Sequence, residues 1–162
     1  MSTSNLYLVY KTKVREVAEF RNGHGSAPPL WGWLGMNFLG WERNSDWLFS
    51  KDMRPLWNLA KDDRVPEWAR ICLAMTLDRA IITVEHQQVA ANACLKCHEV
   101  IDAWPEWANC VNHWKAIGEA IATVKIPKRS AGLGLSCTSV SDVWLDRAKG
   151  RIGFDCVGYV RS

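Results

Sequence analysis

Residues 85–124, EHQQVAANACLKCHEVIDAWPEWANCVNHWKAIGEAIATV, carry two apolar stripes at helical spacing. Residues three or four positions apart lie on one face of an α-helix, so each stripe predicts a buried face. Pro105 divides the stretch and suits the first turn of a second helix. We therefore expect a helical hairpin of residues 85–104 and 105–124. The expected buried positions are Val89, Ala90, Ala93, Cys97, Val100, Ile101, Trp104, Trp107, Cys110, Val111, Trp114, Ile117, Ile121 and Val124.

Shorter elements flank this hairpin on both sides. The apolar run 6–11 predicts a strand buried on both faces, residues 14–21 show helical spacing, and Ser26 is placed to cap a short helix that begins with prolines. Helices are expected at 53–61 and 66–78, irregular chain at 40–51, and strands at 80–84 and 152–160. Apolar residues alternate with glycine, serine and threonine at 133–140. A hairpin would bring residues 143–146 beside 151–156. The expected fold class is α+β, with a central helical hairpin and shorter helices packed against a small sheet built from N-terminal and C-terminal strands.

Length and composition favour a single globular domain over residues 1–162. The chain is 48% hydrophobic and 23% charged, which is close to the average for globular proteins, and its formal net charge is only +3. Basic residues cluster at 125–129 and again at Arg147, Lys149 and Arg151, and we interpret both clusters as solvated loops. DNA-binding domains carry a stronger basic footprint, so a nucleic-acid partner has weak support.

The chain has neither the basic, apolar start of a secretory signal nor an apolar stretch long enough for a membrane helix. We therefore expect a cytoplasmic protein without a membrane partner. Its six cysteines should be reduced thiols that pack as small apolar side chains, because disulfides are rare in the cytoplasm.

Two metal-binding patterns overlap within the hairpin. The run Cys94-Leu95-Lys96-Cys97-His98 matches the haem attachment pattern C-x-x-C-H, but it lies inside a predicted helix. Cys94, Cys97, Cys110 and His113 have spacing that suits a structural zinc site with three thiolates and one imidazole. Both cysteine pairs continue apolar helical stripes, so we interpret them as packing and expect neither a metal nor a cofactor. A zinc-stabilised module that contacts nucleic acid is the alternative.

Sequence motifs of common enzymes are absent. The chain contains no phosphate-binding P-loop, dinucleotide fingerprint, H-E-x-x-H zinc motif or G-x-S-x-G nucleophile elbow. His24 lies between two glycines and is a candidate acid, base or anion contact. An enzyme that uses His24 is a second alternative, less favoured than a binding protein.

Tryptophan is the most unusual feature, with ten residues in the chain. Trp31, Trp33, Trp41 and Trp47 fall in a glycine-interrupted stretch where regular burial of all four is difficult. Because tryptophan is enriched at interface hot spots, we expect these four residues and His24 to form a binding site for a protein partner. The oligomeric state is left open.

The chain has a general resemblance, not carried by any motif, to short proteins encoded by bacteriophages and mobile elements. That resemblance implies a small, non-enzymatic protein that binds and inhibits a host or defence factor. A protein partner is therefore expected.

Overall fold

A computed structural model describes residues 3–21, 26–77, 79–107, 113–137 and 153–162. Along the chain these residues form β1 (Thr3–Val9), β2 (Val14–Arg21), α1 (Ala27–Phe38), α2 (Arg54–Asn58), α3 (Glu67–Met75), β3 (Ala80–Ile81), α4 (Gln87–Asp102), α5 (Trp114–Thr123), β4 (Gly132–Ser136), β5 (Phe154–Asp155) and α7 (Cys156–Arg161). Short 3-10 turns are η1 (Asp46–Phe49), η2 (Leu59–Lys61), η3 (Val84–His86) and η4 (Pro105–Trp107). The predicted α+β class is confirmed.

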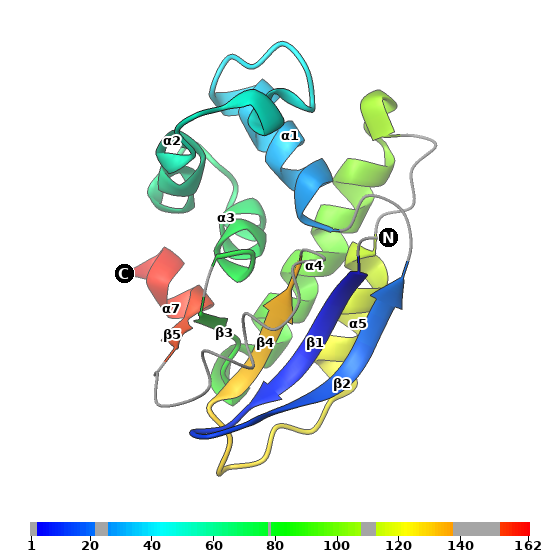
Figure 1. Ribbon diagram of the computed structural model, residues 1–162, viewed down its shortest axis with the longest axis vertical. Helices are drawn as coiled ribbons and strands as arrows, with labels where there is room; N and C mark the ends of the chain where they lie inside the picture. The colour runs from blue at the N-terminus through cyan, green and yellow to red at the C-terminus, as the bar shows by residue number, and fades with distance from the viewer. Residues whose placement is uncertain (1–2, 22–25, 78, 108–112, 138–152) are drawn as a thin grey trace.

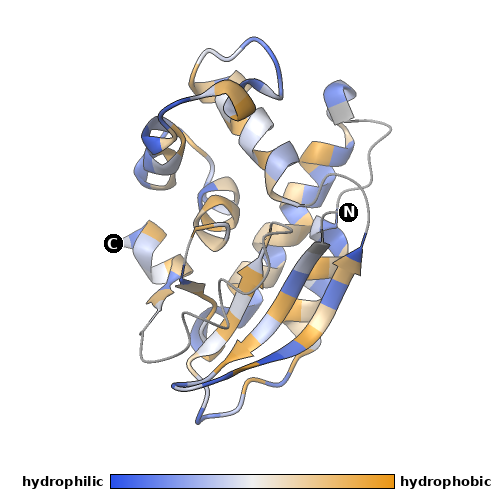
Figure 2. Ribbon diagram, viewed as in Figure 1, coloured by the Kyte–Doolittle hydropathy of each residue, from blue (hydrophilic) through white to orange (hydrophobic). Residues whose placement is uncertain are grey.

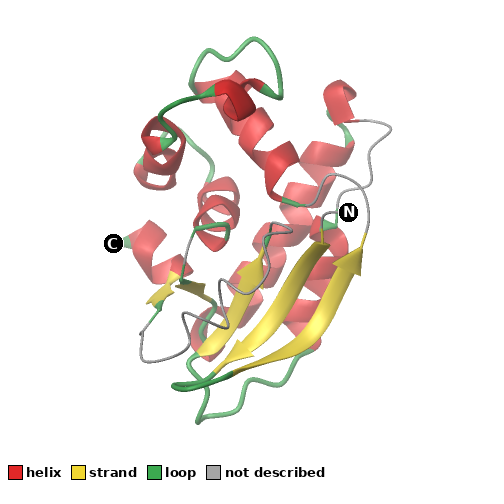
Figure 3. Cartoon of the chain, viewed as in Figure 1, coloured by secondary structure: helices red, strands yellow, loops and turns green. Residues whose placement is uncertain are grey.

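The main sheet is antiparallel and has the strand order β2-β1-β4 (Figure 3). A bridge between Ile82 and Leu133 connects it to β3, which pairs in parallel with β5. The sheet is thus built from segments near both ends of the chain, as the sequence predicts. Helices α4 and α5 lie against one face of this sheet (Figure 1).

The side chains of β1 alternate between a face of the sheet that the helices cover and the opposite face. Ser4, Leu6 and Leu8 are fully buried beneath the helices, whereas Asn5 and Tyr7 are half-buried on the other face. Figure 2 shows the same alternation of apolar and polar residues along β1 and β2. The predicted burial of this strand on both faces is therefore wrong for most of its length, because an antiparallel strand commonly has one covered face.

The predicted helix at residues 14–21 is also wrong, since this segment is the edge strand β2. The register between β1 and β2 shifts between Leu6 and Tyr7, which places one extra residue in β2. Val17 and Ala18 consequently both pack against the core. Two adjacent inward residues in a bulged strand produced the spacing that resembles a helix.

The α4–α5 hairpin lies at the centre of the core and begins much as predicted. Trp114 is fully buried, and its indole N–H donates to the carbonyl of Ser26 at 2.8 Å. The side-chain amide of Gln87 donates to the carbonyls of Ile121 and Val124 at the end of α5, at 2.7 and 2.6 Å. The second helix begins at Trp114 rather than Pro105, which starts the short turn η4. Residues 108–112, including Cys110, lie outside the described residues.

Two further expectations near the chain ends need correction. Ser26 precedes α1 but makes no capping hydrogen bond, and its hydroxyl instead lies 3.1 Å from the hydroxyl of Ser4. The predicted strand at 152–160 is only β5, after which the chain turns into α7. Asp155 causes this change, because its carboxylate accepts the backbone N–H of Val157 at 3.2 Å and caps the helix. The predicted hairpin partner at 143–146 falls outside the described residues.

The shorter helices agree with their predicted faces. The segment predicted as a helix at 53–61 forms α2 and η2, and Leu56, Leu59 and Ala60 are buried there. In α3, Ile71 and Met75 are buried. The chain between α1 and α2 is irregular, as expected, apart from η1. This connection carries the candidate site.

Candidate functional site

The connection between α1 and α2 folds back onto α1 because two glycines leave room for it. A Cβ atom at Gly35 would overlap the ring of Trp41, and one at Gly32 would overlap the backbone carbonyl of Asn44. Glycine is therefore required at both positions for this close approach. Gly32 and Gly35, which interrupt the tryptophan-rich stretch, are therefore packing positions.

The tryptophans of this region form two groups of packed aromatic rings. The ring of Trp31 meets those of Trp47 and Trp57 edge to face, with centroids 5.2 and 5.3 Å apart. Trp33 lies against Trp68 of α3, at 5.2 Å. Edge-to-face aromatic pairs add about 0.5–1.5 kcal/mol beyond the area they bury. The group of Trp31, Trp47 and Trp57 therefore anchors η1, which contains Trp47, to α1 and α2.

Asp46 fixes the shape of the loop that leads into η1. One of its carboxylate oxygens accepts the backbone N–H groups of Glu42 and Arg43, at 3.0 and 3.1 Å, and the other accepts Nε of Arg43 at 3.0 Å. The backbone N–H of Arg43, supported by its side chain and by the N–H of Glu42, lowers the pKa of Asp46. The carboxylate is thus charged at neutral pH and holds the turn that starts η1.

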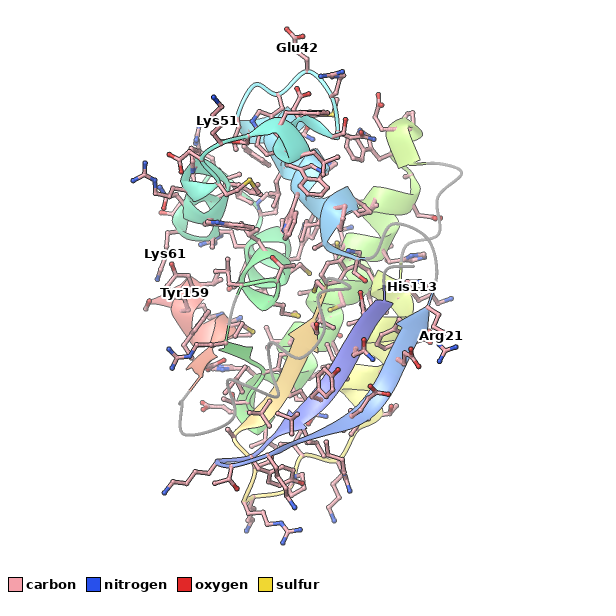
Figure 4. The ribbon with its side chains drawn as sticks, viewed as in Figure 1. Arg21, Glu42, Lys51, Lys61, His113 and Tyr159 are labelled. Carbon is pink, nitrogen blue, oxygen red and sulfur yellow. The ribbon has the colours of Figure 1, made fainter. Side chains whose placement is uncertain are left out.

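Two apolar side chains project from this fixed turn into solvent. Leu48 is 59% exposed and Phe49 is 71% exposed, the largest exposed fraction among the large apolar residues that the structure describes. The guanidinium of Arg43 lies 5.8 Å from the centroid of the Phe49 ring. We call Leu48 and Phe49 the apolar tip. In Figure 4 the label of Glu42 marks the end of the molecule where this loop lies.

Of the residues predicted to bind a partner, Trp47 directly precedes the apolar tip and Trp31 packs against Trp47. Trp31 is 9% exposed and donates its indole N–H to the hydroxyl of Thr76 at 3.1 Å. Trp33, Trp41 and Trp47 are partly buried and packed against the core. Whether any of the four contacts a partner stays a prediction, and His24 lies outside the described residues. Sequence reasoning missed Leu48 and Phe49, although they directly follow Trp47 in a stretch predicted as irregular.

The cysteines near the hairpin are buried thiols. The five that the structure describes are Cys72, Cys94, Cys97, Cys137 and Cys156, and all are free. Burial raises the pKa of each, above all at Cys72 and Cys94. The thiol of Cys94 lies 3.8 Å from the sulfur of Met75. Because the thiolate is the nucleophile and the metal-binding form, these environments oppose both kinds of chemistry.

The structure describes three of the four predicted zinc ligands. Cys94 and Cys97 point into the core from α4, and His113 precedes α5 with its ring 6.3 Å from that of Phe20. Cys110 is not among the described residues. Within the described part of the chain, no three histidine, cysteine or acidic side chains are arranged to hold a metal ion. The zinc alternative stays a prediction.

A histidine–aspartate pair connects the start of α4 to the C-terminal segment. Nδ1 of His86 lies 2.6 Å from Oδ2 of Asp155, and both side chains are largely buried. The other oxygen of Asp155 caps α7. This pair therefore joins η3 to β5 and α7, a structural role that sequence reasoning did not find because the two residues are 69 positions apart.

A shallow groove between α3 and α4 is too small for a typical ligand. Its volume is about 220 Å³, below the roughly 300–1,000 Å³ of small-molecule pockets. Its lining combines Glu67, Trp68 and Ile71 of α3 with Val89, Asn92 and Ala93 of α4. The apolar tip is therefore the stronger candidate site.

Comparisons with known proteins add no assignment. No family model, curated protein or solved structure matched the chain. Among the described helices, none is both long enough and apolar enough to cross a bilayer.

Proposed function

We propose that the protein is a non-enzymatic binding protein whose apolar tip inserts into an apolar pocket of a partner protein. The observation that carries this proposal is the exposure of Leu48 and Phe49 on a turn that is already fixed. Asp46 holds this turn through two hydrogen bonds to backbone N–H groups and one to the Arg43 side chain, and Trp47 in the same turn packs against Trp31. A preformed anchor loses little conformational freedom on binding, which favours affinity.

A protein partner fits the chemistry of this site. Exposed aromatic side chains are enriched among interface anchors, and Arg43 beside Phe49 adds a second residue type typical of hot spots. The five thiols that the structure describes are too deeply buried for nucleophilic catalysis. A protein that occupies a surface in this way would block whatever else binds there. In this proposal the partner is a host or defence factor, which the protein inhibits by occupying its surface.

The experiment has two stages. A photo-crosslinking amino acid at position 49, and separately at position 84, first identifies the partner in the cells that make the protein. Val84 is the matched control because it is 64% exposed but lies on η3. Only the probe at position 49 should capture the partner.

The purified partner is then titrated against Phe49→Ser, Leu48→Ser and Val84→Ser, each with an unchanged melting temperature. Loss of an anchor costs about 2 kcal/mol, so Phe49→Ser should weaken binding roughly thirty-fold. Val84→Ser should bind like the unmodified protein. Equal losses at positions 49 and 84, or no loss at 49, would contradict the proposal.

A further inference from the structure

Two loops lie side by side at the opposite end of the molecule's long axis from the apolar tip (Figure 1). Residues 10–13 connect β1 to β2, and the N–H of Tyr10 donates to the carbonyl of Lys13 at 2.8 Å. Residues 124–131 connect α5 to β4, and the N–H of Ala131 donates to the carbonyl of Val9 at 2.8 Å. Backbone hydrogen bonds thus hold both loops at one end of the sheet.

These loops bring together five exposed basic side chains from two segments that are far apart in the sequence. We call them the basic end: Lys11, Lys13, Lys125, Lys128 and Arg129. Neither loop contains an acidic residue. In the part of the chain that the structure describes, none of the five forms an ion pair. These five side chains carry a charge of +5 and the whole chain has a formal net charge of +3, so the rest of the chain has a net charge of −2.

The basic end is held in place before any ligand arrives. The N–H and the hydroxyl of Ser130 both donate to the carbonyl of Pro127, at 3.0 and 2.7 Å, and close a turn whose two central residues are basic. The guanidinium of Arg129 lies 5.9 Å from the centroid of the Tyr10 ring, and Nζ of Lys13 lies 5.3 Å from it. These cation–π contacts hold charges from both loops against one half-buried ring.

We infer that the basic end binds the phosphodiester backbone of nucleic acid without reading its sequence. Lys and Arg contacts to phosphates release condensed counterions, and this effect supplies most of non-specific affinity. A protein partner fits less well, because protein interfaces are depleted in lysine and need an apolar centre. The large exposed apolar residues among those described are Leu48, Phe49, Val84 and Tyr159, and none belongs to these loops. This inference is independent of the proposed protein-binding function.

The test measures binding of fluorescent oligonucleotides of unrelated sequence by anisotropy. Duplex DNA, single-stranded DNA and RNA are each titrated between about 50 and 200 mM salt. Lys11→Gln with Lys13→Gln removes charge from one loop, and Lys125→Gln, Lys128→Gln and Arg129→Gln together remove it from the other. Lys51→Gln with Lys115→Gln is the matched control, because both lysines are exposed elsewhere. Circular dichroism confirms that each variant folds.

At least one of the three nucleic acids should bind, with an affinity that falls as salt rises. The Lys11/Lys13 variant should lower the salt slope by about two and the affinity at about 50 mM salt by at least roughly ten-fold. The control should change neither quantity by more than about two-fold.

Three outcomes would overturn the inference. One is the absence of binding to all three nucleic acids at low salt. Another is an equal loss of affinity in the control and in the basic-end variants. The third is binding of polyglutamate or of vesicles with anionic lipids more tightly than any nucleic acid, which would assign the basic end to an acidic protein or a membrane surface.

Discussion

Trp114 links the start of α5 to Ser26, the residue that precedes α1. It is fully buried, and its indole N–H satisfies the carbonyl of Ser26, 88 residues away in the sequence. A buried carbonyl without a partner costs about 1–3 kcal/mol. The residue therefore contributes both apolar burial and a long-range hydrogen bond, and the two contributions can be separated experimentally.

Trp114→Phe should lower the free energy of unfolding by about 1–3 kcal/mol, because it keeps a ring but removes the donor to Ser26. Trp114→Ala should lower it by about 3–5 kcal/mol, since it also leaves a cavity. Urea denaturation measures both losses, with Val84→Ala on the surface as the control. If Trp114→Phe unfolds at the same urea concentration as the unmodified protein, the hydrogen bond to Ser26 does not stabilise the fold.

The buried thiols give a second prediction, which depends on pH. An ordinary cysteine has a pKa near 8.5, so its alkylation by iodoacetamide speeds up as pH rises to about 9. Burial raises the pKa of Cys72, Cys94 and Cys97, so at pH 9 a smaller fraction of each is thiolate in the folded protein than in an ordinary cysteine. They should be alkylated only after denaturation, which peptide mapping by mass spectrometry can follow. Rapid labelling of any of the three in folded protein at pH 9 would show that the thiol is accessible.

At the scale of elements, helical periodicity predicted the helices well where a helix has one continuous buried face. Ile71 and Met75 of α3, and Ala93, Cys97 and Ile101 of α4, are buried as expected. The same periodicity was misleading at β2. A shift in register there lets the adjacent residues Val17 and Ala18 both pack against the core. A local pattern cannot distinguish these cases, because the pairing that decides between them comes from β1.

The C-terminal segment shows the same limit. Residues 152–160 are rich in apolar and aromatic side chains, which favoured a strand. The segment ends as α7 because Asp155 caps it, and the same carboxylate contacts His86. The candidate site was only partly predictable for a related reason. The sequence identified the tryptophan-rich stretch, but the exposure of Leu48 and Phe49 depends on how Gly32 and Gly35 let the loop fold back onto α1.

At the scale of the whole molecule, the two proposed surfaces lie at opposite ends of the long axis (Figure 4). The apolar tip lies in the connection between α1 and α2. The basic end lies in the loops that connect β1 to β2 and α5 to β4. Charges separated by more than about 8 Å of water are largely screened at physiological salt. The two loops of the basic end and the turn that carries Phe49 are held by separate hydrogen bonds. The two surfaces should therefore act without coupling.

This independence is the last prediction, and it rests on both proposals. Phe49→Ser should weaken binding to the partner protein and leave nucleic-acid affinity unchanged, whereas Lys11→Gln with Lys13→Gln should do the reverse. The combined variant should show both losses, additive within about 0.5 kcal/mol, because distant sites without shared contacts rarely couple. Saturation with the partner should leave the oligonucleotide affinity within about two-fold, and sedimentation should detect a complex of all three components. If the partner and the oligonucleotide instead exclude each other, the partner extends across the sheet to the basic end, and the apolar tip is only part of a larger interface.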